Sequence, residues 1–165
     1  MRKIISIFLV NIFITSCGIY SFTGASIPAE AKTASVTYIK STVTNSPASL
    51  SQIITEGLKD LVLSQTNLDL TESEGDLSFS GQITKYQLIP MAIQANETAG
   101  KNRLTIGIKV KYNNSINIEQ NFESTFSRYR DFNSSENLAD VEDFLIEEIT
   151  KELLEDVFNK AFVNW

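Results

Sequence analysis

Residues 103–112 read RLTIGIKVKY, and apolar residues alternate with polar or small residues through the whole stretch. In a β-strand, successive side chains point to opposite faces of the sheet. The apolar set therefore lies on one face, while Arg103, Lys109 and Lys111 lie on the other. This pattern is typical of an antiparallel strand with one buried and one solvent-facing side.

The following segment continues the same buried face. Residues 113–115 are polar and predict a turn, and we expect Ile116, Ile118, Phe122 and Phe126 to point inward on the next strand. The two strands are then a hairpin.

Strand character also appears upstream, at residues 35–42 and, more briefly, at 67–70. Residues 77–83 alternate cleanly, but the apolar phase then slips by one residue before Tyr86. Such a slip predicts a β-bulge near Thr84.

Two segments have the apolar spacing of amphipathic helices. The first covers about residues 47–64, after a polar start that is typical of a helix cap. Gly57 lies on its apolar face, where we expect close packing against a sheet. The second begins near Leu138 and runs for about 25 residues. Its other face is rich in Asp and Glu, which we interpret as a solvated surface.

The order of these elements (β-α-β-β-β-α) predicts an α+β fold. We expect a two-layer α/β sandwich, with both helices on one face of a mostly antiparallel sheet of four to five strands. The other face of the sheet is left open to a partner, a ligand or solvent.

The first residues have the composition of a secretory signal peptide. Arg2 and Lys3 precede an apolar run, which ends in small residues before Cys17. The run is shorter than the roughly 20 residues of a membrane-spanning helix. We therefore predict a signal peptide at 1–16, a tether at 17–32 and a single domain at 33–165.

The composition argues against several functions. The chain has no His and one Cys, which excludes Ser-His-Asp triads, the usual His-based zinc sites and an intrachain disulfide. Removing the signal leaves 14 − 2 = 12 basic residues against 20 acidic ones, a balance that disfavours nonspecific nucleic-acid binding. We expect no enzyme, no cofactor and no metal site. The enzymatic alternative is a carboxylate hydrolase using pairs such as Asp140 and Asp143.

Residues 14–17 resemble the lipobox of bacterial lipoproteins. The resemblance implies that the thiol of Cys17 takes a diacylglycerol and that its new amine is acylated, for example by palmitate. Two or more acyl chains anchor a protein stably. Gly18 is not the Asp that retains many lipoproteins in the inner membrane, and no acidic cluster follows, so the resemblance implies a periplasm-facing outer-membrane lipoprotein. A free thiol in an ordinary secreted protein is the alternative.

Residues 17–24, CGIYSFTG, resemble the start of the LptE family of lipopolysaccharide-assembly lipoproteins, and further matches follow in order. They are Asp76, Leu77, Gly81, Ile83 and Tyr86; Arg103, Leu104, Ile106, Val110 and Tyr112; Phe126, Ser127, Tyr129, Asp131 and Phe132; and residues 155–159 with Trp165. The last two groups resemble the branch of this family found in Bacteroidetes-type bacteria.

The resemblance implies a non-enzymatic plug and assembly partner of the LptD β-barrel, which assists insertion of lipopolysaccharide into the outer leaflet. It also implies a two-layer α/β sandwich. One departure is the acidic balance of the mature chain, because family members that bind lipopolysaccharide use basic side chains. The alternative function is a generic periplasmic lipoprotein that binds another envelope protein.

The candidate lipopolysaccharide contacts are basic. No acid occurs between residues 98 and 118, and Lys85, Arg103 and Lys111 are placed to meet lipid phosphates. Cross-strand ion pairing is the alternative. A hairpin closed at Asn114 puts Lys109 opposite Glu119 and brings Arg103 diagonally near Glu123.

Candidate contacts with a protein partner are aromatic or Arg residues, which are common at interfaces. Arg128, Tyr129 and Arg130 follow the hairpin, and Tyr20 and Phe22 lie in the tether. Packing of the tether aromatics in the core is the alternative.

Overall fold

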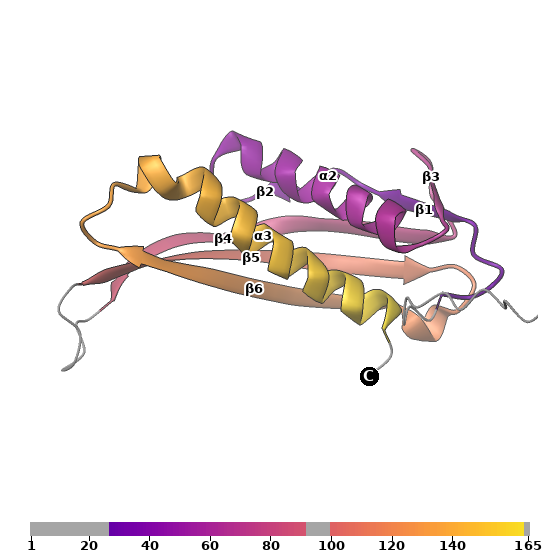
Figure 1. Ribbon diagram of the computed structural model, residues 1–165. Coiled ribbons are helices and arrows are strands. Elements are labelled where there is room, and N and C mark those ends of the chain that lie inside the picture. Colours follow the sequence, from indigo (N-terminus) through magenta and orange to yellow (C-terminus); the bar gives the residue numbers. More distant parts are fainter. Residues whose placement is uncertain (1–26, 92–99, 164–165) are drawn as a thin grey trace, which may run out of the picture.

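The computed structural model describes residues 27–91 and 100–163. They form one sheet with two helices on one of its faces (Figure 1). The elements are β1 (Thr33–Val36), β2 (Lys40–Ser41), α2 (Ala48–Gln65), β3 (Asp69–Leu70), β4 (Leu77–Met91), β5 (Lys101–Asn114), the 3-10 helix η2 (Ile118–Gln120), β6 (Phe122–Asn133) and α3 (Leu138–Phe162). The predicted two-layer α/β sandwich is confirmed.

The sheet is mostly antiparallel as expected, but it has six strands instead of four to five and includes short parallel pairings. Its six strands run in the order β3-β1-β4-β5-β6, with β2 also paired to β4. The three long strands are antiparallel, but β1, β2 and β3 join in parallel. The connection through α2 explains this direction, because a helical crossover returns the chain to the sheet in parallel.

The first predicted strand is split into β1 and β2. Between them, the backbone amide of Ile39 donates to the hydroxyl of Thr55 on α2, at 3.0 Å, instead of to the sheet. The amide of Thr37 still donates to β4, so the chain leaves this strand at Tyr38 and Ile39 before β2 returns to it.

The predicted bulge lies in β4 at Thr84. Ile83 is paired with Ile108 and Lys85 with Gly107, so Thr84 has no partner residue on β5. The extra residue keeps both Ile83 and Tyr86 on the helix-covered face and turns Lys85 to the other face. A one-residue insertion thus preserves the core on both sides of the phase slip.

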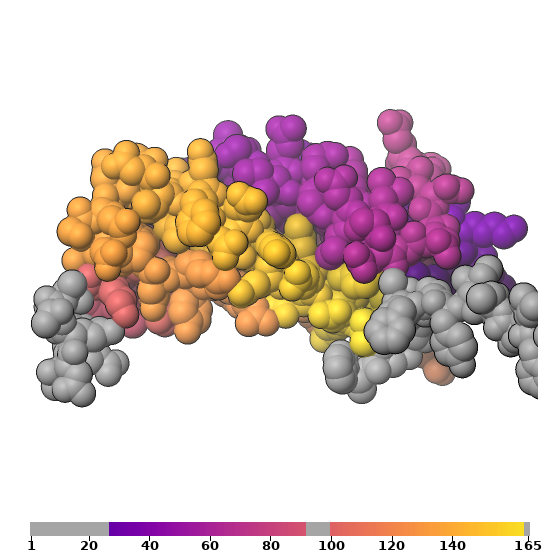
Figure 2. Space-filling model, viewed as in Figure 1, coloured from indigo at the N-terminus to yellow at the C-terminus, as the bar shows by residue number. Residues whose placement is uncertain are grey.

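The core lies between the sheet and the two helices. Figure 2 shows α2 and α3 in contact over the covered face. Gly57 serves this helix contact rather than packing against the sheet as expected, since a Cβ there would lie 2.7 Å from Cδ1 of Leu154. Leu58, Ile108 and Leu153 are fully buried between the layers.

An aromatic cluster fills one end of the core. The ring of Tyr112 lies 4.9 Å from that of Phe79, 5.4 Å from Phe122 and 6.0 Å from Phe162. Among the described residues, the hydroxyl of Tyr112 is the one buried side-chain polar atom without a hydrogen-bond partner. Burial raises the pKa of Tyr112 to about 12.

The connection from β5 to β6 corrects the predicted tight turn. Lys109 lies opposite Thr125 instead of Glu119, so its partner on the second strand is six residues later than predicted. The loop contains η2, and Asn114 holds it. The side-chain oxygen of Asn114 accepts from the backbone amides of Ile116 and Asn117, and its own backbone amide donates to the side-chain oxygen of Asn121. Ile116 and Ile118, expected to be inward, are exposed there.

Both helices have the predicted extent within about two residues, but neither start has a side-chain cap. Ser46 donates instead to the carbonyl of Val43, at 3.0 Å, and so closes the turn before α2.

Candidate functional site

The sheet face opposite the helices is the candidate site, and we call it the open face. Strand alternation and the registers of β4, β5 and β6 place polar side chains along it. They are Ser78, Ser80, Gln82, Lys85 and Gln87 from β4; Arg103, Thr105, Lys109, Lys111 and Asn113 from β5; and Glu123, Thr125, Ser127, Tyr129 and Asp131 from β6.

Arg103 is held by two neighbours on β6. Its Nε and Nη2 donate to the two carboxylate oxygens of Asp131, at 2.7 and 2.8 Å. Its guanidinium also lies 3.7 Å from the centre of the Tyr129 ring. The bidentate bond lowers the pKa of Asp131 and raises that of Arg103. The expected cross-strand pairing of Arg103 therefore occurs, with Asp131 in place of Glu123.

Lys109 and Lys111 lie on either side of Glu123. Lys109 forms an ion pair with this carboxylate, and Lys111 is its direct cross-strand neighbour. Both interactions lower the pKa of Glu123, with the larger effect from Lys109. These side chains border a shallow hollow of about 330 Å³ on the open face, together with Gly81.

Lys85 reaches the open face because of the bulge. It lies beside Gly107, whose missing side chain leaves room: a Cβ there would lie 3.0 Å from that of Lys85. Within residues 27–91 and 100–163, no hydrogen bond or ion pair engages the ammonium group of Lys85. Of the three candidate lipopolysaccharide contacts, Lys85 and Lys111 are thus more available than Arg103.

The three predicted partner contacts on β6 are divided between the two faces. Tyr129 lies on the open face, whereas Arg128 and Arg130 point to α3. Nε of Arg128 donates to Asp156 at 2.6 Å. Arg130 forms ion pairs with Glu152 and Glu148. These bonds stabilise the contact between α3 and the edge strand of the sheet.

The acidic face of α3 is therefore only partly a solvated surface, which corrects the expectation. Glu152 and Asp156 pair with β6, and Glu142 accepts a hydrogen bond from the hydroxyl of Tyr86. Burial and this carboxylate raise the pKa of Tyr86. Glu147 and Glu155 are exposed as predicted.

An apolar end was missed by the sequence reasoning. Leu88, Ile89 and Met91 near the end of β4 are exposed, and Phe144 on α3, expected in the core, is 65% exposed. We call these four residues the apolar tip. Leu88 continues the inward phase of Tyr86, and Phe144 has the apolar spacing of α3, but the core ends before these elements do. Ile89 and Met91 are in the opposite phase, on the side of Arg103. The lipid-attachment residue Cys17 and the tether aromatics Tyr20 and Phe22 lie outside the described residues.

The fold and the open face define a class of α/β sandwich proteins with one uncovered polar sheet face. The profile of the LptE family, described as lipopolysaccharide-assembly, matches residues 31–161. The chain belongs to the LptE family. No curated protein matches it significantly in sequence.

Solved structures share the fold at low sequence identity. A minor lipoprotein of Acinetobacter baumannii is 12% identical with a TM-score of 0.52, over 79% of this chain and 91% of that one. A protein of Xanthomonas campestris is 7% identical with a TM-score of 0.50, over 81% and 87% of the two chains. Within the described residues, neither helix has the length and hydropathy to cross a membrane.

Proposed function

We propose that this chain is an outer-membrane lipoprotein, anchored through Cys17, that acts as plug and assembly partner of the LptD β-barrel in lipopolysaccharide transport. The family match supports a role in lipopolysaccharide assembly. The observation that carries the plug role is the open face, which is polar along most of three long strands and on which both acids are paired with basic side chains.

A plug must suit the lumen that surrounds it, and the interior of outer-membrane barrels is polar. Arg103 with Asp131 and Lys109 with Glu123 are paired on the open face, so most of its charge is neutralised within the chain. The paired charges can lie against a polar lumen, whereas Lys85 and Lys111 remain for acidic groups of the partner or of a ligand.

The length of the sheet also suits this role. β1 pairs with the Leu77 end of β4, whereas the apolar tip lies near Met91 at the other end. The 14 residue steps of β4 span roughly 46 Å. A lipid tether entering at β1 would therefore hold the apolar tip on the far side of the barrel from the anchor.

Lipopolysaccharide carries phosphates, and Lys85 and Lys111 are the basic side chains best placed to meet them. They lie on the open face, on neighbouring strands, and Lys111 borders the hollow of about 330 Å³. Ammonium groups bind phosphate oxygens by charge-assisted hydrogen bonds. We assign Arg103 a lesser role, because Asp131 already occupies its donors.

The experiment that tests the plug role is purification of the tagged chain from its native outer membrane in mild detergent, followed by mass spectrometry. We expect a stoichiometric barrel of the LptD kind. A variant with Cys17→Ser, which removes the acylation site, should lose the membrane fraction and is the control for anchoring. Recovery of the acylated chain without a barrel would favour the generic periplasmic binding module.

The lipid contacts need a separate measurement. Lys85→Gln with Lys111→Gln should weaken binding of purified lipopolysaccharide several-fold, while Lys151→Gln, an exposed lysine on α3, is the matched control. Equal binding of lipopolysaccharide by all variants would show that Lys85 and Lys111 on the open face do not contact it.

A further inference from the structure

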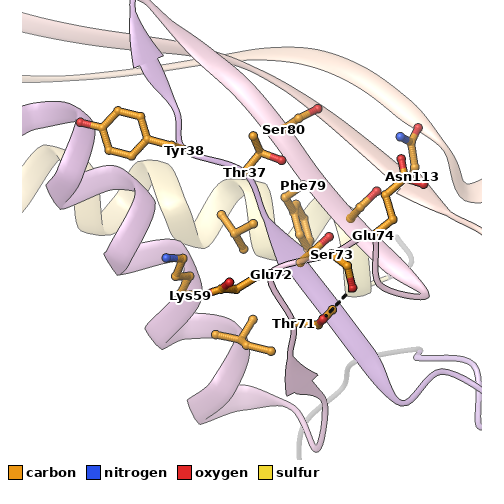
Figure 3. A pocket seen from close by; sticks show the side chains of 14 residues that line it. Thr37, Tyr38, Lys59, Thr71, Glu72, Ser73, Glu74, Phe79, Ser80 and Asn113 are labelled. Carbon is orange, nitrogen blue, oxygen red and sulfur yellow. Dashed lines mark hydrogen bonds between the residues drawn. The ribbon is translucent and has the colours of Figure 1, made fainter.

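A hollow of about 520 Å³ lies beside β1, at the point where β3 ends (Figure 3). Its walls come from both faces of the sheet: Val36 and Leu70 from the helix side, and Ser78 and Ser80 from the open face. We call it the β1 slot. Because the hollow lies beside the edge of β1 and reaches both faces of the sheet, it occupies the position that an additional strand would take.

At this edge of β1, the backbone groups of Val36 have no hydrogen-bond partner among the described residues. The amide of Thr37 donates to the carbonyl of Phe79 on β4, at 2.9 Å, and the carbonyl of Ala34 accepts from Thr71 on the β3 side. Successive strand residues direct their backbone groups to opposite edges. The N–H and C=O of Val36 therefore point into the slot, and β3 pairs with β1 only as far as Ala34.

The side chains of the slot add two further preferences. Val36 and Leu70 offer a partly buried apolar surface on the helix side. Figure 3 shows Glu72 and Glu74 on the loop that follows β3, and neither carboxylate has a hydrogen bond or an ion pair with any described residue. Lys59, on the wall formed by α2, is already paired with Glu56 at 2.9 Å. The uncompensated charge is therefore negative.

An unpaired strand edge is a template for an added strand, because main-chain hydrogen bonds supply the attraction and flanking side chains the selectivity. We propose that the β1 slot binds a short extended segment of a partner polypeptide, which pairs with Val36 and presents a Lys or Arg to Glu72 and Glu74. The edge from Val36 to Tyr38 spans roughly 7 Å, which is enough for about three paired residues. This site goes beyond the proposed function. It lies at the edge of β1, whereas the proposed lipid contacts lie on the open face of β4 and β5.

Amide exchange of the full chain in detergent gives the first test. The Val36 amide should exchange with solvent faster than the Thr37 amide, which is bonded to β4. Equally slow exchange at both positions would mean that the chain itself fills the edge, and it would overturn the proposal.

The second test uses a library of acetylated and amidated hexapeptides in which Lys or Arg alternates with Val, Ile, Leu or Phe. We expect selected peptides to move the amide resonance of Val36, and N-methylation of alternate peptide amides to abolish binding while methylation of the others does not. No shift with any member at millimolar concentration, or equal tolerance of every N-methyl group, would overturn strand addition. A shift with sucrose but with no peptide would assign the slot to carbohydrate instead.

Matched variants separate the backbone from the side chains. Val36→Pro removes the N–H and should lose binding at least tenfold. Val36→Ala removes more apolar contact than proline does but keeps the N–H, and it should bind within a few-fold of the original. Glu72→Gln with Glu74→Gln should weaken binding several-fold, and Glu147→Gln on α3 should not. If Val36→Pro fails to fold, the N-methyl series decides alone. Equal binding by the Val36 variants would contradict the proposal.

Discussion

The guanidinium of Arg103 donates to both carboxylate oxygens of Asp131, across the β5–β6 ladder, at 2.7 and 2.8 Å. This pair joins the two strands at the open face and engages a cation that also lies over the ring of Tyr129. A ligand phosphate at Arg103 must therefore compete with a carboxylate that is already in place. The pair limits the affinity of the open face for anions.

Asp131→Asn should release Arg103 and tighten the binding of purified lipopolysaccharide several-fold, because the guanidinium gains free donors for phosphate. The melting temperature should change little, since the pair lies at the surface, with its side chains 28% and 30% exposed. Isothermal titration calorimetry and a thermal melt measure the two effects. Glu147→Gln makes the same charge change away from the open face. An equal gain in affinity for lipopolysaccharide in this variant would mean that the net charge, and not the release of Arg103, causes the gain.

Stability should depend on pH through Asp76, whose carboxylate accepts bonds from the amides of Lys32 and Thr33 and from the Thr33 hydroxyl. These bonds lower the pKa of Asp76 from its usual 3.8. Because folding lowers this pKa, the ionised carboxylate stabilises the fold at pH values above the ordinary pKa of Asp. This stabilisation is lost as the pH falls through the lower pKa of the folded state. The original chain should therefore melt above an Asp76→Asn variant at pH 7, and the difference should shrink below about pH 4. A constant difference down to the lowest pH would contradict this role.

Substitution by alanine at two glycines should change the free energy of unfolding by different amounts. At Gly81 a Cβ would lie 2.4 Å from the backbone oxygen of Lys109, which cannot move without breaking the β4–β5 ladder. Gly81→Ala should cost about 2–3 kcal/mol of the free energy of unfolding. At Gly57 the obstacle is a terminal methyl of Leu154, and helix propensity favours alanine by about 1 kcal/mol. Gly57→Ala should stay within about 1 kcal/mol of the original in urea unfolding, and the opposite order would be evidence against these packings.

Tyr112→Phe should leave stability unchanged or raise it by about 1–2 kcal/mol, because it removes a buried hydroxyl that has no partner among the described residues. The ring contacts with Phe79 and Phe162 are kept. Urea unfolding of the two proteins measures the difference. A loss above about 1 kcal/mol would show that the hydroxyl is hydrogen-bonded in solution.

Local patterns were sufficient for most of the fold. The alternation of residues 103–112 predicted β5, the helical spacing from Leu138 predicted α3, and a phase slip predicted the bulge at Thr84. Each of these depends on which side of one element is buried, and that information is local to the element.

The register between β5 and β6 could not be predicted from the pattern of either strand alone. It depends on a loop that Asn114 and Asn121 hold through side-chain bonds, and a polar run such as 113–121 is equally compatible with a tight turn. An error in loop length changed every cross-strand partner, including Asp131 for Arg103.

The candidate site was predictable only in part for the same reason. Alternation alone predicts that Tyr129 lies on one face of the sheet and that Arg128 and Arg130 lie on the other. It does not indicate which of the two faces α3 covers. The carboxylates of Glu152 and Asp156 reach the two arginines from more than twenty positions away in sequence. The β1 slot was invisible as well, because it arises where a two-residue strand stops.

Photo-crosslinking from the open face tests the plug role most directly. A benzoylphenylalanine in place of Thr125, on the exposed side of β6, should give a crosslinked species in native cells, with mass spectrometry identifying a barrel of the LptD kind as the second component. Normal abundance of the variant, with crosslinks only to other envelope proteins or to none, would contradict the account.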